Sequence, residues 1–266
     1  MPHAAGLWYE WHGPEDGEVL ILSPGLGGSA KYWAPNLAAL AQLYRVLAYD
    51  HRGTGRSARE LSRDVTVEDM AGDLLALMDG LGLPSATLIG HAAGGVIGLA
   101  LALRAPERLD GLVIVNGWSW PDPHFVRCLD TRIVLLHGGA DAFLHAQPLF
   151  LYPARWSSAN DGLLIAEEAL QRMDFPGITN VEARIAALIA FDIDARLAEI
   201  GTATLLIAAE DDMLVPASCS ERLAEGLPGA TLERTTGGHA CNVTCPDQFN
   251  RTVLAWLEGR GNEGAQ

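Results

Sequence analysis

The stretch Gly90-His91-Ala92-Ala93-Gly94 gives the strongest indication of the fold. A β-type run, residues 86–89, leads into it, and a largely apolar helical pattern, residues 96–103, follows it. Two glycines around a sharp strand-to-helix turn are typical of a nucleophile elbow, which holds its central side chain exposed at the top of a parallel sheet. The central residue here is Ala92, so the turn presents a methyl group that can neither attack a substrate nor be activated.

Two further residues occupy the positions expected of an acid and a base. In folds built around such an elbow, the acid and then the histidine follow the nucleophile along the chain. Asp212 comes just after a buried-strand pattern, with Asp211 as the second choice. His239 follows a later strand pattern, on a glycine-rich loop. The sequence therefore predicts a hydrogen bond between His239 and Asp212, with the other ring nitrogen of His239 facing Ala92.

The loop after the strand pattern of residues 19–22 is a candidate anion site. It reads Ser23-Pro24-Gly25-Leu26-Gly27-Gly28-Ser29. One donor of an oxyanion hole comes from such a loop and the other from the residue after the nucleophile position, which predicts the N–H groups of Leu26 and Ala93 as donors. A helix that starts at Ala93 adds a favourable dipole. A plain turn and a phosphate loop are the alternatives, but the Gly-Lys-Ser/Thr ending of a P-loop and the full Gly-x-Gly-x-x-Gly fingerprint are both missing.

The remaining chain alternates strand and helix patterns except in one long stretch. The alternation predicts an α/β fold with a mostly parallel, doubly wound sheet. Between residues 119 and 192 it stops, and two helical patterns occur, residues 163–173 and 181–191. A stretch of that length needs structure of its own. We therefore expect a core formed by residues 1–118 and 193–266, and a helical cap inserted at residues 119–192.

Several other side chains have a predicted role. Aromatic residues near the expected site are candidates for substrate binding, with ordinary packing as the alternative for each: Trp33, Trp118, Phe150 and Tyr152. Asp50 and Arg52 are expected to form a structural pair that braces the glycine-rich loop. His91 is expected to be a structural histidine. Cys241 is an alternative nucleophile, although small buried cysteines are common packing residues.

Composition restricts the class of protein. The chain has 266 residues, 49% of them hydrophobic, which suits one large domain with a sizeable core. A net charge of -15 argues against nucleic acid or an anionic membrane as a partner. Signal-peptide and membrane-span patterns are absent and the four cysteines lack zinc-finger spacing, which predicts a cytoplasmic protein with no metal or cofactor. The sequence leaves the oligomeric state open, a homodimer included.

The motifs together resemble the α/β-hydrolase superfamily across almost the whole chain. Within it they are similar to the RutD family, hydrolase-like proteins of the Rut pyrimidine-utilisation pathway. The narrower resemblance is carried by residues 23–29 with Tyr32-Trp33, the serine-less elbow, Asn116-Gly117-Trp118, residues 147–154 and residues 237–244. The resemblance implies a role in uracil breakdown with 3-aminoacrylate or carbamate as the substrate, and it fits an alanine at the elbow.

A site without serine can still act on a labile substrate. Loss of the nucleophile costs triad hydrolases about 10⁶-fold in turnover, while an oxyanion hole and binding alone retain roughly 10³–10⁴-fold over water. We therefore expect a hydrolase of a small anionic C–N substrate, in which His239 activates water, Asp212 orients His239, and Leu26 and Ala93 bind the anion. The alternatives are a catalytically silent binding or accessory protein and a serine-to-alanine variant of an ordinary esterase.

Overall fold

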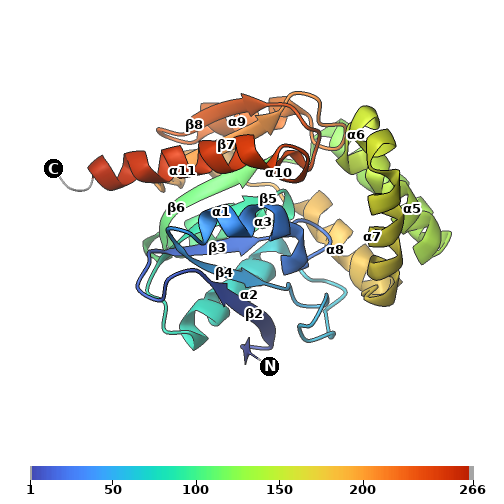
Figure 1. Ribbon diagram of the computed structural model, residues 1–266, viewed down its shortest axis with the longest axis horizontal. Helices are drawn as coiled ribbons and strands as arrows, with labels where there is room; N and C mark the ends of the chain where they lie inside the picture. The colour runs from blue at the N-terminus through green and yellow to red at the C-terminus, as the bar shows by residue number, and fades with distance from the viewer. Residues whose placement is uncertain (1, 264–266) are drawn as a thin grey trace.

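The computed structural model describes residues 2–263, with side chains up to residue 260. One eight-stranded sheet runs through the molecule in the order β1-β2-β4-β3-β5-β6-β7-β8 (Figure 1). Its strands are β1 (His3–Ala4), β2 (Leu7–His12), β3 (Val19–Ser23), β4 (Arg45–Tyr49), β5 (Ala86–His91), β6 (Leu109–Val115), β7 (Thr204–Ala209) and β8 (Thr231–Thr235). The first two strands are antiparallel to their neighbours, and every other pairing is parallel. The predicted α/β fold with a mostly parallel sheet is confirmed.

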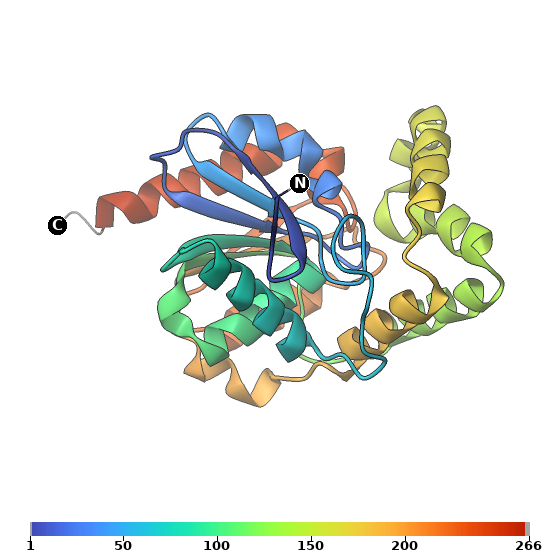
Figure 2. The ribbon, with the colours of Figure 1, turned by 90° about the horizontal axis from the view of Figure 1, so that it is seen from below.

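Helices cover both faces of this sheet. On one side lie α2 (Val67–Gly80) and α3 (Ala93–Arg104), and on the other α1 (Ala34–Leu40) and α11 (Pro246–Glu263) (Figure 2). The remaining core helices are η1 (Ala30–Trp33), η2 (Pro106–Arg108), η3 (Asp194–Glu199), α9 (Ala217–Gly226) and α10 (Cys241–Thr244). Successive residues of a strand pack against the helices on opposite faces of the sheet. Ile21 packs in the cluster under α2 and α3, and its neighbours Leu20 and Leu22 pack in the cluster under α1 and α11. The central strands therefore read as largely continuous apolar runs because both of their faces are buried.

Five α-helices lie between β6 and β7, ahead of η3. They are α4 (Pro123–His137), α5 (Ala140–Leu151), α6 (Ala154–Ala159), α7 (Asp161–Met173) and α8 (Ile178–Ala190). Figure 2 shows this group standing to one side of the sheet, where we expect the cap. The cap contacts the loop after β8, because the N–H of Ala240 donates to the carbonyl of Leu151 at 3.0 Å. The boundaries at residues 119 and 192 stay a prediction.

The two glycines of the elbow let α3 lie unusually close to the strands. A Cβ atom added to Gly94 would collide with the carbonyl oxygen of Ser23, and one added to Gly90 would collide with the main chain of Gly94. In both cases the obstacle is backbone, which can move only if a strand or the helix moves with it. The glycines are thus needed for close approach at the place where the elbow meets β3.

We expect Gly94→Ala to lower the free energy of unfolding by about 3 kcal/mol, the upper end of overpacking effects, because the colliding atom is a carbonyl of a central strand. The control is Gly162→Ala near the start of α7, where an added Cβ would meet no atom within 4 Å. That change should be neutral or up to about 1 kcal/mol stabilising. Urea denaturation followed by circular dichroism measures both, and equal stabilities of the two variants would refute the close-approach argument.

Within residues 2–263, no helix combines the length and the apolar character that a membrane crossing requires.

Candidate active site

Ala92 lies at the tip of the turn between β5 and α3, with φ 47° and ψ -107°. Residues other than glycine rarely adopt a positive φ, and such strain costs about 1–3 kcal/mol. Hydrogen bonds hold the turn in place: the N–H of Ala92 donates to Val115 at 2.8 Å, and the carbonyl of Ala92 accepts from Gly95 and Val96 at 2.9 and 3.0 Å. The chain therefore builds a strained elbow and places a methyl group at its tip.

His239 and Asp212 form the hydrogen bond that the sequence predicts. Nδ1 of His239 lies 2.7 Å from Oδ2 of Asp212, and the two side chains are 3% and 0% exposed. The other carboxylate oxygen, Oδ1, accepts from the N–H groups of Leu214 and Val215 at 2.7 and 3.0 Å. Because both oxygens are engaged, the carboxylate is fixed, and it fixes in turn the orientation of the imidazole with its proton on Nδ1.

Asp211, the second choice for the acid, has a different role. Its Oδ1 accepts from the N–H groups of Gly237 and Gly238 at 2.8 and 2.9 Å. Both glycines have a positive φ, 120° and 71°, which favours glycine at these positions. Asp211 therefore shapes the loop that carries His239, while Asp212 contacts the ring.

Two side chains hold the main chain of His239 beside the elbow. Its carbonyl accepts from Nε2 of His91 and from Nδ2 of Asn116, each at 2.8 Å. The Oδ1 of Asn116 accepts from the N–H of Ala209 at 2.8 Å, so this residue links the ends of β6 and β7 to the histidine loop. No site role is predicted for Asn116 from the sequence, where it is marked by its position directly after a strand and by the family motif Asn116-Gly117-Trp118.

The ring of His91 packs against that of His239, with 4.6 Å between their centroids. Burial lowers the pKa of His91 well below its ordinary value, so the ring is neutral. Since a carbonyl only accepts, the proton is on Nε2, and Nδ1 has no partner among the described residues. These contacts are those of the structural histidine that we expect, although only one of its nitrogens is hydrogen-bonded.

The two predicted anion donors lie at the start of α3 and on the loop between β3 and η1. No hydrogen bond among residues 2–263 uses the N–H of Leu26 or of Ala93. The loop itself is held by the next loop of the chain: the carbonyl of Gly28 accepts from the N–H of His51 at 2.8 Å and from Oγ1 of Thr54 at 3.0 Å. Both N–H groups are thus free to bind a ligand, and their role as anion donors stays a prediction.

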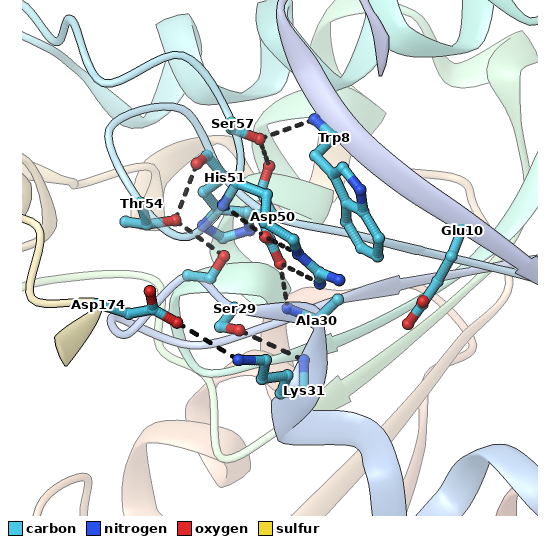
Figure 3. Close-up of polar contacts among 12 residues, drawn as sticks. Trp8, Glu10, Ser29, Ala30, Lys31, Asp50, His51, Thr54, Ser57 and Asp174 are labelled. Carbon is cyan, nitrogen blue, oxygen red and sulfur yellow. Dashed lines mark hydrogen bonds and ion pairs between the residues drawn. The ribbon is translucent and has the colours of Figure 1, made fainter. Parts of the chain in front are cut away.

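The expected pair of Asp50 and Arg52 does not form. Asp50 accepts from the N–H of Ala30 at 2.8 Å (Figure 3) and pairs with Arg56 at 2.9 Å. Arg52 instead pairs with Asp73 of α2, at 2.7 Å. The chain turns after β4, so side chains two residues apart point to different neighbours. Of the two residues, Asp50 is the one that contacts the end of the glycine-rich loop, through Ala30.

Two of the aromatic candidates have core-like surroundings. Trp33 is fully buried in the cluster under α11, with its ring centroid 6.1 Å from that of Phe249. Trp118 is also buried and packs against Phe125, with centroids 4.3 Å apart. The contacts described for Trp33 and Trp118 are packing contacts, so their predicted part in substrate binding stays a prediction.

Phe150 and Tyr152 lie closer to the histidine loop. They flank Leu151, whose carbonyl accepts from the N–H of Ala240. Phe150 is buried at the end of α5, and burial raises the pKa of Tyr152 to about 12, so its phenol is protonated. Of the four aromatic candidates these two are the better placed, and substrate binding by them stays a prediction.

Tyr32 is a further residue beside the site, and no role is predicted for it from the sequence. Its hydroxyl donates to Oδ1 of Asn242 at 2.7 Å, and its ring lies against His91 with 4.6 Å between centroids. Burial raises the pKa of Tyr32 well above its ordinary value, which keeps the hydroxyl protonated. The side chain therefore joins η1 to the short helix after His239.

Cys241 does not suit the role of a substitute nucleophile. It is 1% exposed, and burial raises the pKa of its thiol to about 12. A nucleophilic cysteine needs its thiolate at neutral pH, so this thiol is inert. Within the described part of the chain, no three His, Cys, Asp or Glu side chains are grouped so that they could hold a metal ion.

The strained elbow, the buried His–Asp pair and the mostly parallel sheet are the features of an α/β hydrolase. A family model described as "alpha/beta hydrolase fold" matches residues 18–243. The enol-lactonase from Burkholderia xenovorans LB400 is a similar solved structure, with a TM-score of 0.87 and 26% identity over 95% of this chain and 96% of that one.

Comparison with relatives of similar sequence shows which family within the α/β hydrolases the chain belongs to. A protein from Caulobacter sp. (strain K31) is 55% identical over 258 residues, which is 96% of each chain. One from Agrobacterium fabrum (strain C58) is 50% identical, over 94% of this chain and 98% of that one. Both carry the name "Putative carbamate hydrolase RutD". The chain belongs to the RutD family of α/β hydrolases.

Proposed function

We propose that this protein hydrolyses a small, labile, anionic C–N substrate, either 3-aminoacrylate or carbamate, in uracil breakdown. The names of its relatives support carbamate directly. The observation that carries the proposal is a fully buried Asp212, hydrogen-bonded at 2.7 Å to the ring of His239, beside an elbow that has no nucleophile. An oriented base without a side-chain nucleophile is suited to activating water.

In the proposed reaction His239 is the general base. Asp212 occupies Nδ1, which leaves Nε2 as the ring nitrogen that accepts a proton. Water gives that proton to Nε2 as its oxygen attacks the substrate carbon, and the carboxylate of Asp212 stabilises the imidazolium that forms. With carbamate, His239 then returns the proton to the departing nitrogen, and ammonia leaves with bicarbonate as the other product. With the imine tautomer of aminoacrylate, the returned proton gives a carbinolamine. His239 next passes the proton of the new hydroxyl to the nitrogen as the C=O bond forms, and ammonia leaves with an aldehyde as the other product.

The negative charge of the substrate is placed against the two free backbone donors. The N–H groups of Leu26 and Ala93 are unused within the protein, and Ala93 begins the twelve-residue helix α3. A helix N-terminus attracts anions through its free N–H groups and its dipole. Ala92 is 5% exposed and His239 is 3% exposed, so the site as it stands suits only a very small substrate.

A binding or accessory protein is the second candidate, because the elbow carries alanine. In that case the His–Asp pair is a structural element and water is not activated. The two candidate functions predict different reactivity for a serine placed at residue 92. In a hydrolase, the elbow and His239 would activate the serine hydroxyl as a nucleophile, and in a binding protein they would not.

We expect Ala92→Ser to react with a fluorophosphonate serine probe, since the strained turn would present the hydroxyl and His239 would take its proton. Intact-protein mass spectrometry would measure the label. The double variant Ala92→Ser/His239→Ala is the control and should stay unlabelled. Ammonia release by Ala92→Ser should not exceed that of the wild type, because the added hydroxyl would compete with the attacking water for the space beside His239. A folded Ala92→Ser protein that takes up no label would favour the binding-protein candidate.

A further inference from the structure

The cap places a buried cation on the loop that carries the Leu26 donor. Arg184 of α8 is 1% exposed. Its Nε donates to the carbonyl of Leu26 at 3.1 Å, and its Nη2 donates to the carbonyl of Gly25 at 3.4 Å. Nη2 also lies 2.7 Å from Nδ1 of His51. One guanidinium therefore joins the cap, the glycine-rich loop and the loop after β4.

The contact with Gly25 acts directly on the predicted anion donor. The carbonyl of Gly25 and the N–H of Leu26 belong to one planar peptide unit, in which they point in opposite directions. A donor that fixes the carbonyl therefore fixes the direction of the N–H. Because the donor is a cation, it also polarises the peptide and makes the N–H a stronger donor. The N–H of Gly28 donates to the same carbonyl at 3.0 Å, so two donors hold this peptide plane.

The charge of Arg184 is not neutralised by the residues around it. Among residues 2–263 it forms no ion pair, and its Nη1 has no hydrogen-bond partner. Burial lowers its pKa to about 10, which still leaves it charged at neutral pH. A buried charge without a partner is unfavourable unless an anion compensates it. In a chain with a net charge of -15, this is a local positive site.

The network behind Arg184 adds no charge of its own. Burial lowers the pKa of His51 well below its ordinary value, and the charge of Arg184 lowers it further. The ring of His51 is therefore neutral. A guanidinium only donates, so Nδ1 of His51 is the acceptor and Nε2 carries the proton, 3.2 Å from Oγ of Ser23. Ser23 in turn contacts the hydroxyl of Tyr49 at 2.9 Å. The only charge in this buried group is the guanidinium.

We propose that Arg184 is the positioning residue of the Leu26 donor and that its charge makes the site select a small anionic ligand over the neutral isostere. The ligand class is a small carboxylate or carbamate. The proposal rests on the proposed function for the place of the anion, and it is independent of whether bond cleavage follows.

The test is a comparison of acetate with acetamide, which have the same shape and differ in charge. The amide resonances of Leu26 and Ala93 in the ¹⁵N-labelled protein report binding of each ligand. Arg184→Met removes the charge and the donors at similar volume, and we expect it to weaken acetate binding by about tenfold or more, the size of a charge-assisted interaction, with little effect on acetamide. Arg184→Lys keeps a charge but loses the forked donor geometry, and it should recover part of the acetate affinity.

Arg132→Met is the matched control. Arg132 is a second buried arginine of the cap, but it donates to Gln147 at 2.7 Å and lies over the rings of Phe143 and Phe150, and it forms no hydrogen bond with the described residues of the glycine-rich loop. The Arg132→Met protein should bind acetate as the wild type does. Unchanged acetate binding by Arg184→Met, an equal loss of acetate and acetamide, or an equal loss in Arg132→Met would each overturn the proposal. Loss of acetate selectivity in a protein that releases no ammonia would support the anion site and count only against the proposed hydrolysis.

Discussion

Replacing His239 with alanine is expected to lower the rate of ammonia release, after subtraction of the spontaneous reaction, by about 10²–10⁴-fold. The reason is that, among the described residues, His239 is the only side chain hydrogen-bonded to the buried Asp212, and its ring takes the proton of water in the proposed reaction. The assay couples released ammonia to glutamate dehydrogenase, with aminoacrylate generated freshly in the cuvette and carbamate tested separately.

The control for this variant is His145→Ala. His145 lies on α5 of the cap with a side chain that is 84% exposed and an ion pair with Glu168. We expect wild-type rates from it, since it contacts none of the site residues. Equal catalytic rates from His239→Ala and the wild type would exclude His239 as the base.

The second large effect is expected for Asp212→Asn, which should lower the rate of ammonia release by about 10²–10⁴-fold in the same assay. Asparagine keeps the shape but offers an amide, which disfavours the imidazole tautomer with its proton on Nδ1. The ring would then carry its proton on Nε2, where it could not accept one from water.

Asp211→Asn is the comparison for that variant. Asp211 Oδ1 accepts only from backbone N–H groups of Gly237 and Gly238, and an amide oxygen can replace it there. We expect a much smaller loss from Asp211→Asn than from Asp212→Asn. If the two changes had the same effect, the special position of Asp212 beside the ring would be disproved.

Most of the core was predictable because local signals and tertiary packing agree there. The strands β3 to β7 are largely apolar runs ended by turns, and Gly90 and Gly94 mark a place where a helix must lie close against a strand. Other elements carry weaker signals. The strand β2 includes a charged residue and is only partly buried, so its pattern is not that of a central strand. The helix α5 contains Pro148, which argues against a helix in a sequence pattern.

The site was predictable where residues follow strand ends in chain order, as Asp212 and His239 do. It was not predictable where distant residues meet. Asn116 and His239 are 123 residues apart, and Arg184 and Leu26 are 158 apart. Nothing local distinguishes Arg184 from the exposed arginines, because its burial depends on how the cap folds over the loop. The Asp50–Arg52 pair was wrong for a related reason, since spacing alone does not give the direction of side chains after a strand ends.

The most direct test of the central claim is ammonia release by the wild-type protein from freshly generated 3-aminoacrylate and from carbamate, each measured against the reaction without protein. We expect release well above the spontaneous rate on at least one of the two substrates, with no acyl- or carbamoyl-protein detected by mass spectrometry during turnover. Wild-type rates equal to the spontaneous rate on both substrates would contradict the proposed hydrolysis.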